Sequence, residues 1–388
     1  MVVISRKFFV LVTTLLVMSG HTYYISHMTK YFGLAISFLA VGFFIFKYRG
    51  IIRPSSNNLV IGSIAAALIA YSFFSVLYTN YFSTFSLNMF FFISTFLILI
   101  TARLGEEDII WLLKVLFWFQ ITYAIFEYAY PLEYYLDPVS GTWQSRPFDS
   151  IFSVFKRLSG FAGNSNTSAA LLCATFLALC SRVKNFGYFC LVLFVCVFMF
   201  KSRSSYGALL VSGLFVFYNT KYFFGYVLFL ILAFVLALLF YFSAPEAADA
   251  IFRLEALFVS GQNSFSTRAT INDFAINQFD DLSILFGTGL FNETHFLAML
   301  DAPRSYIESS FVKLYFEGGL LWLLLFNLFL LSIFYVNRGK SAAAVLIFYV
   351  LNSIFETSFL QTNLLAIVPY ILNYSSPVVK RDIRHMAL

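Results

Sequence analysis

A succession of long apolar runs constrains the fold of this chain more than any other feature. Crossing the hydrocarbon core of a bilayer takes about 17–25 residues of helix, and about twelve runs are suited to this. They fall at 8–26, 31–47, 59–79, 83–102, 109–127, 167–182, 185–201, 205–220, 222–243, 310–336, 341–358 and 362–376. Hydrophobic residues make up 60% of the chain and charged residues 11%, against about 45–50% and about 25% in soluble domains. Because backbone groups in lipid need hydrogen-bond partners within the segment, we expect an all-α polytopic membrane protein, with one integral membrane domain over residues 1–388.

The lysines and arginines between these runs predict the orientation of the chain. If the N-terminus is cytoplasmic, the inner connections and the two termini carry Arg6, Lys7, Lys47, Arg49, Arg53, Arg103, Arg182, Lys184, Lys221, Arg338, Lys340, Lys380, Arg381 and Arg384. The short connections after the first, third and eleventh runs carry only Lys30. This is the positive-inside pattern, so both termini are predicted to be cytoplasmic. The net charge of +6 therefore indicates topology and not nucleic-acid binding.

Two long loops, 127–166 and 243–309, then fall on the outer side. The second is rich in ionisable residues, although charge is scarce elsewhere: Glu246, Asp249, Arg253, Glu255, Arg268, Asp273, Asp280, Asp281, Glu293, His295, Asp301, Arg304 and Glu308. A short connection would suffice to join two helices, so we expect this loop to face water and to carry chemistry. Lys201 and Arg203, at a short outer junction, break the positive-inside pattern without an acidic neighbour, which requires an explanation.

The segment RLSGFAGNSNTSAA (157–170), in the first loop, combines a cation with a polar helix start. Arg157 precedes small residues, and Asn164 and Asn166 stand where an apolar run begins. Asn, Ser and Thr are preferred helix N-caps, and a helix N-terminus attracts anions. The segment is either a binding turn for phosphate or sugar, or only a capped helix entry. Arg203, in SRSSYGALL (202–210), is likewise either a phosphate ligand or an arginine that extends to the outer headgroups.

Candidate acids and bases come from the second loop. FGTG (286–289) lacks the context of a nucleotide-binding fingerprint and predicts a turn, and Asp280 with Asp281 is more typical of a solvated turn than of a metal site. His295 is either a general base or a loop histidine. Glu308 begins an apolar stretch, where partial burial suits a carboxyl group to act as a base near neutral pH. Alternatively, Glu308 is a helix N-terminal acid favoured by the helix dipole.

The cysteines give no sign of a disulfide framework or of a metal site. All four lie inside apolar runs, at Cys173, Cys180, Cys190 and Cys196. This placement predicts buried free thiols. We expect no metal ion and no other cofactor.

Taken in order, these motifs resemble those of the bacterial O-antigen polymerase and O-antigen ligase superfamily. The resemblance runs from the fifth apolar run onward. It rests on RLSGFAGNSNTSAA, SRSSYGALL, TRATINDFAINQFDDLSILFGTGL (267–290) and the ending E-S-x-F-x-K-L-x-x-E-G-G-L-L-W (308–322). Ligases of this superfamily have a histidine followed by Asn, Ser or Gln where this chain has Glu308 and Ser309, and His295 lies too early to fit. This departure favours a polymerase.

The resemblance implies a glycosyltransferase of the bacterial inner membrane that joins polyprenyl-diphosphate-linked oligosaccharides at the periplasmic face, in the biosynthesis of lipopolysaccharide or another surface polysaccharide. A base, Glu308 or His295, takes the proton of an acceptor hydroxyl, which attacks the anomeric carbon of the donor while the lipid diphosphate, such as undecaprenyl diphosphate, leaves. Arg203 and Arg268 match arginine positions of the family, with Arg157 as a third candidate. The expected partners are lipid-linked oligosaccharides, membrane lipids and a chain-length regulator protein.

Two other functions stay open. One is a ligase that transfers glycan to a lipid or protein acceptor, and the other is a transporter or flippase of lipid-linked sugars. Transporters place ionisable groups near the middle of their spans, whereas the only charged residues well inside the apolar runs here are Lys114, Lys313 and Glu317. This distribution favours an enzyme. Aromatic residues of the first loop either stack on sugar rings or belong to an interfacial belt, and they include Tyr134, Tyr135 and Trp143.

Overall fold

The computed structural model describes part of the chain. The described residues are Lys7, Val10, Leu11, Thr14 and Leu15, together with residues 56–79, 106–129, 134–136, 143–145, 158, 160–162, 165–180, 185–218, 220–243, 264–277, 281–290, 293–299, 307, 309–336 and 340–355. Helices dominate this part, which agrees with the expected fold class. The predicted runs at 31–47, 83–102 and 362–376 lie outside the described residues, as does most of 8–26.

Long helices occupy the remaining predicted runs. They are α3 (Ser56–Thr79), α5 (Glu106–Ala129), α6 (Ser165–Cys180), α7 (Phe186–Phe194) with the π-helix η1 (Val195–Met199), α8 (Arg203–Phe217), α9 (Phe223–Ser243), α15 (Ser310–Val336) and α16 (Lys340–Phe355). An apolar run forms a helix because the helix pairs its own backbone groups. Within the described ranges, two segments are long and apolar enough to cross a membrane, Glu107–Ala129 and Ser310–Ser332.

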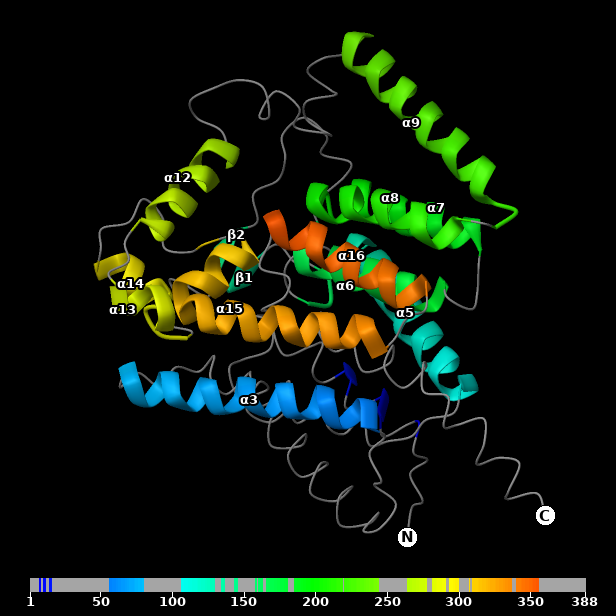
Figure 1. Ribbon diagram of the computed structural model, residues 1–388. Helices are drawn as coiled ribbons and strands as arrows, with labels where there is room; N and C mark the ends of the chain where they lie inside the picture. The colour runs from blue at the N-terminus through cyan, green and yellow to red at the C-terminus, as the bar shows by residue number, and fades with distance from the viewer. Residues whose placement is uncertain are drawn as a thin grey trace, which may run out of the picture.

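The helices form a bundle around α6. Nearly the whole of α6 is buried, from Thr167 to Cys180, and its many alanines and serines allow close approach of neighbouring helices. Gln120 of α5 donates a hydrogen bond to Thr175 of α6 at 3.1 Å, and α8 and α16 pack on other sides of α6. Figure 1 shows α3, α15, α16 and α8 side by side, with α9 directed away from the bundle.

The two predicted loops contain structure that the sequence analysis did not foresee. In the first, β1 (Tyr134–Leu136) and β2 (Trp143–Ser145) form an antiparallel pair in which Tyr135 lies opposite Gln144. This hairpin is a small departure from an all-α fold. In the second, α12 (Ser264–Ile276), α13 (Asp281–Phe286) and α14 (Glu293–Met299) gather at one end of α15 (Figure 1). FGTG follows α13 as the predicted turn, with positive φ at Gly287 and Gly289.

The cysteine thiols are free, as predicted. Three are buried, whereas Cys190 is partly exposed. The sequence did not indicate that Cys173 of α6 and Cys196 of η1 lie together, with their sulfur atoms 3.5 Å apart. This contact helps to join α6 to the end of the α7–η1 segment.

Candidate functional site

The chain turns sharply between η1 and α8. Lys201 adopts a left-handed backbone conformation with φ of 50°, and the Ser202 N–H donates to the carbonyl of Cys196 at 3.1 Å. Ser202 is extended and precedes the first helical residue of α8, Arg203. A left-handed conformation is uncommon for residues other than glycine. The backbone of Lys201 is therefore strained at this corner, and the surrounding packing holds it in place. The corner places two cations, Lys201 and Arg203, at the start of a helix.

A buried polar cluster joins this corner to α6 and α16. The Ser205 hydroxyl accepts from the Ser202 hydroxyl at 3.0 Å. Its own proton is shared between the backbone carbonyl of Asn166 and the side-chain oxygen of Asn352, each 3.5 Å away. Ser202, Ser205 and Asn352 are fully buried. The two motifs that the sequence analysis considered separately, RLSGFAGNSNTSAA and SRSSYGALL, therefore meet in three dimensions.

Two helix N-termini and two cations lie at this corner. The first four N–H groups of a helix have no partner within that helix, and here the N-terminal ends of α6 and α8 are held close together through Asn166 and Ser205. Arg203 is half-buried at the first position of α8. A cation at this end of a helix opposes the helix dipole by about 0.3–1 kcal/mol. A bound anion would offset this cost.

The loop before α6 is held against the same corner. The Gly160 N–H donates to the Glu127 carboxylate at 2.7 Å, and the Ala162 N–H donates to the Ser168 hydroxyl at 3.1 Å. Gly160 has φ of +68°, and a Cβ atom there would lie 2.4 Å from Ser168 Cβ. Glu127 is 2% exposed at the end of α5, where the sequence predicted only the boundary of a loop. An acid that ends an apolar run was the available signal. Arg157 and Asn164 lie outside the described residues.

A second region forms where α12 and α14 cover the beginning of α15. A small core joins the three helices: Ile271 and Ala275 of α12, Leu297 of α14, Ile307, and Phe316 of α15. Arg268 belongs to α12 and His295 to α14, while Glu308 stands between the buried residues Ile307 and Ser309. The core thus brings together the segments that carry these three predicted residues. The side chains of Arg268 and His295, and the whole of Glu308, lie outside the described part of the chain.

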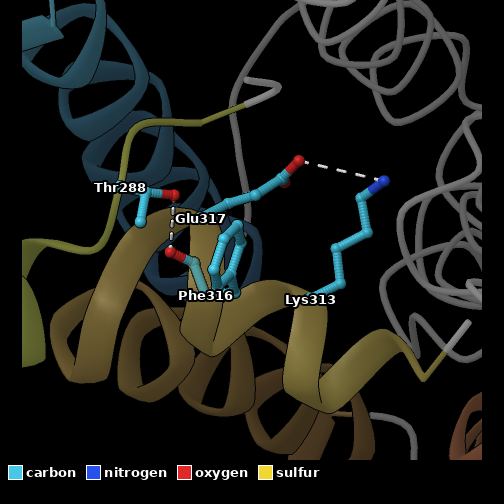
Figure 2. A network of polar contacts seen from close by, with 4 residues as sticks. All are labelled: Thr288, Lys313, Phe316 and Glu317. Atoms are coloured by element: carbon cyan, nitrogen blue, oxygen red, sulfur yellow. Dashed lines mark hydrogen bonds and ion pairs between the residues drawn. The ribbon is translucent and has the colours of Figure 1, made fainter. Parts of the chain in front are cut away.

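The FGTG turn docks on a break in α15. The break is at Gly319, with φ of 64° and ψ of −169°. The Thr288 hydroxyl donates to the Phe316 carbonyl at 3.0 Å (Figure 2). The Thr288 N–H donates to the same carbonyl at 2.9 Å, and the Gly289 N–H donates to the Glu317 carbonyl at 2.9 Å. These donors satisfy carbonyls that the broken helix leaves without their usual partners.

Helix α3 completes this junction from the other side. The Tyr71 hydroxyl lies 2.7 Å from the Gly318 carbonyl and 3.1 Å from the Phe286 carbonyl, so it can donate to either. Its ring stacks on Trp322, with ring centroids 5.3 Å apart. Ser75 accepts from the Leu290 N–H at 2.9 Å. The second loop is therefore fixed to α15 by hydrogen bonds to backbone carbonyls, and to α3 by bonds between its backbone and the hydroxyls of Tyr71 and Ser75. No residue pattern in the sequence predicted these contacts.

An ion pair lies on α15 immediately before the break. The Lys313 ammonium is 3.8 Å from a carboxylate oxygen of Glu317 (Figure 2). The Glu317 side chain is 1% exposed and that of Lys313 is 20% exposed. In the sequence, both residues are recognisable only as charges inside an apolar run.

Within the described residues, no group of three or more His, Cys, Asp and Glu side chains is arranged to hold a metal ion. The chain matches none of the protein-family models to which it was compared. None of the curated proteins is recognisably similar to it. The site therefore has to be interpreted from its own residues.

Proposed function

We propose that this chain is a polysaccharide polymerase, a glycosyltransferase that joins polyprenyl-diphosphate-linked repeat units on the outer face of the bacterial cytoplasmic membrane. In this proposal, one lipid-linked glycan is the donor, and a hydroxyl of a second lipid-linked unit is the acceptor. The O–H bond of the acceptor breaks, a bond forms to the anomeric carbon of the donor, and lipid diphosphate leaves. The proposal rests on the motif resemblance and on the cationic corner at the start of α8.

In the proposed membrane topology, the chain has about twelve spans and cytoplasmic termini, and loops 127–166 and 243–309 face the periplasm. Large apolar side chains that stay exposed on the described helices support it. Examples are Phe126 of α5, Phe224 and Phe234 of α9, and Leu324 and Leu331 of α15, all at least 59% exposed. A soluble protein rarely leaves so much apolar surface in water, whereas lipid accommodates it.

The cationic corner is the single observation that carries the enzymatic proposal. In this reaction the leaving diphosphate carries the developing negative charge, and a preorganised cation stabilises it most where water is excluded. Arg203 and Lys201 stand at the start of α8, which a hydrogen bond from Ser205 to the Asn166 carbonyl joins to the first turn of α6. Arginine also matches the geometry of phosphate oxygens with two parallel hydrogen bonds. We assign the diphosphate to this corner, with Arg268 and Arg157 as further ligands.

Glu308 is the proposed general base, with His295 as the alternative. Both belong to segments around the core of Ile271, Leu297 and Phe316. Ser309, directly after Glu308, is buried at the entrance to α15, a setting that suits a carboxylate partly removed from water. A ligase would use the same corner for its donor, so it remains the alternative within the same class.

A transporter of lipid-linked sugars is the second candidate, and one observation favours it. Transporters bind substrates and ions at helices that are interrupted within the membrane, and α15 is interrupted at Gly319 beside the Lys313–Glu317 pair. The polymerase remains preferred because the cations of the corner lie at a helix start and not within a helix.

The surface glycan of cells with and without the chain distinguishes these functions. Loss of a polymerase leaves single repeat units on the final acceptor, so the electrophoretic ladder collapses to one step. Loss of a ligase leaves unattached polymer, and loss of a flippase leaves lipid-linked units in the cytoplasmic leaflet. An unchanged ladder in cells that lack the chain would refute the proposed function.

A further inference from the structure

Helix α5 has one stripe of side chains that stays exposed along most of its length. The stripe contains Glu107, Trp111, Lys114, Trp118 and Ile125. Each residue turns an α-helix by about 100°, so Lys114 lies about 20° from Glu107 around the axis, and the whole stripe falls within an arc of about 60°. The opposite face of α5 is buried and packs on α6.

Two opposite charges stand on this stripe without touching each other. Glu107 and Lys114 are seven residues apart, about 10 Å along the axis, and among the described residues neither side chain has an ion pair or a hydrogen bond. The next acid, Asp108, is already paired with Lys7 at 3.7 Å. Ionisable residues inside a membrane helix are rare and normally pair with an opposite charge. Because both side chains are exposed, their partners are expected in the medium around α5.

The depth of the stripe in the bilayer indicates a lipid headgroup. The segment Glu107–Ala129 is long and apolar enough to cross a membrane, so Glu107 lies at the predicted cytoplasmic interface and Lys114 lies deeper. Cα–Cβ bonds tilt toward the N-terminus of a helix, and a lysine extends its ammonium toward the interface, which is where the lipid phosphates are. Trp111, 39% exposed between the two charges, is typical of the same interfacial layer.

We propose that this stripe binds phosphatidylethanolamine of the cytoplasmic leaflet. The phosphate of this lipid is linked to glycerol and lies deeper than the terminal ammonium, which is the order in which α5 presents the deeper Lys114 and the outer Glu107. The phosphate accepts from the Lys114 ammonium, and the primary ammonium donates to the Glu107 carboxylate. The acyl chains follow the apolar part of the stripe at Trp118 and Ile125, which are 45% and 55% exposed.

The pattern of charge disfavours other occupants. Phosphatidylglycerol has a phosphate but no ammonium for Glu107, and the quaternary ammonium of phosphatidylcholine cannot donate a hydrogen bond. A second copy of the chain packed here across a two-fold axis along the membrane normal would bring two Lys114 side chains together, where a low dielectric constant makes their repulsion large. The inference depends on α5 crossing the membrane with the predicted orientation, and it goes beyond the reaction proposed above, on which it does not depend.

The test is quenching of Trp118 fluorescence by lipids with brominated acyl chains. The purified full-length protein is reconstituted in phosphatidylcholine vesicles that contain a rising fraction of brominated phosphatidylethanolamine, phosphatidylglycerol or phosphatidylcholine. The Trp118→Phe variant gives the signal of the remaining tryptophans, which is subtracted. Brominated phosphatidylethanolamine should associate with the stripe about threefold to tenfold more strongly than either of the other lipids, the effect of one net hydrogen bond.

Three variants change the charges of the stripe. Lys114→Gln and Glu107→Gln should each reduce the preference for phosphatidylethanolamine to less than about twofold. The variant Glu107→Lys/Lys114→Glu keeps the net charge but reverses the order of the two charges, so it should abolish the preference. All three should keep the thermal stability of the wild type, because the altered side chains are exposed. Lys221→Gln, which removes an exposed lysine before α9, is the control and should keep the preference.

Equal association of all three lipids with the wild type would overturn the site, as would an unchanged preference in Glu107→Lys/Lys114→Glu. A preference for phosphatidylglycerol that Lys114→Gln abolishes would also overturn it, because Lys114 would then be a lysine that only reaches anionic headgroups. If no brominated lipid quenches Trp118, a protein or a second copy of the chain covers the stripe, and the lipid site is refuted.

Discussion

Replacing Gly287 and Gly319 by alanine tests whether the FGTG turn and the break in α15 form one rigid junction. Gly287 has φ of +70° and Gly319 has φ of +64°. A Cβ atom on Gly287 would lie 2.5 Å from the carbonyl carbon and oxygen of Glu317, and one on Gly319 would lie 2.4 Å from those of Leu285. Each glycine therefore faces the backbone of the opposite segment, and each substitution has to push the same two segments apart.

The expected cost has two parts. An alanine at a positive φ costs about 1–2 kcal/mol in the left-handed helical region, and about 1–3 kcal/mol at the φ and ψ of Gly319, which essentially only glycine adopts. Separating the segments also breaks the two bonds of Thr288 to Phe316 and that of Gly289 to Glu317, at about 0.5–1.5 kcal/mol each. Either single substitution should lower the free energy of unfolding by about 3–6 kcal/mol. In the double variant the strain of alanine is added twice, but the same hydrogen bonds can be lost only once. The loss of free energy of unfolding should therefore be about 2–4 kcal/mol smaller than the sum of the two single losses.

The assay is reversible unfolding of the purified protein in mixed micelles with increasing SDS. Gly207→Ala and Gly225→Ala are matched controls, because a Cβ atom at either glycine meets nothing within 4 Å. Alanine there should be neutral or stabilising by up to about 1 kcal/mol, owing to its higher helix propensity. Additive effects of Gly287→Ala and Gly319→Ala, or single effects as small as those of the controls, would refute the rigid junction.

Three further predictions concern topology and catalysis. Reporter fusions at Gly141 and Gly261 should both indicate the outer compartment, and a cytoplasmic signal at either position would refute the predicted topology. Arg203→Lys should shorten the surface glycan at normal protein levels, since a point charge does not replace the forked hydrogen bonds of a guanidinium. The control is Lys221→Gln, which removes an exposed cation of the predicted inner side. Full-length glycan in Arg203→Lys would argue that Arg203 only contacts lipid headgroups. Glu308→Gln should reduce the rate of polymerisation by about 10²–10⁴-fold, as loss of a general base does, and collapse the ladder to single units. If Glu308→Gln polymerises normally while His295→Ala fails, the base is His295.

For the described part of the chain, the sequence alone determined where the long helices are. Runs such as 109–127 and 310–336 correspond to α5 and α15 because a helix pairs its own backbone groups, so an apolar run needs no distant partner to take this form. The polar start of α6 and the FGTG turn were predictable for the same reason, since caps and turns depend on a few adjacent residues. The hairpin of β1 and β2 was missed because each strand has only three residues, too few to show a period.

Only the tertiary structure decided which of these local features meet. Ser205 lies beside Asn166 and Asn352, which are 39 and 147 residues away along the chain, and Tyr71 reaches the Gly318 carbonyl across 247 residues. The short helices α12 and α14 show so little apolar periodicity that the sequence did not predict them, and they are held through the core they share with Phe316. Contacts of this kind depend on how whole helices pack, and a pattern of neighbouring residues carries no information about a partner that is distant in the chain.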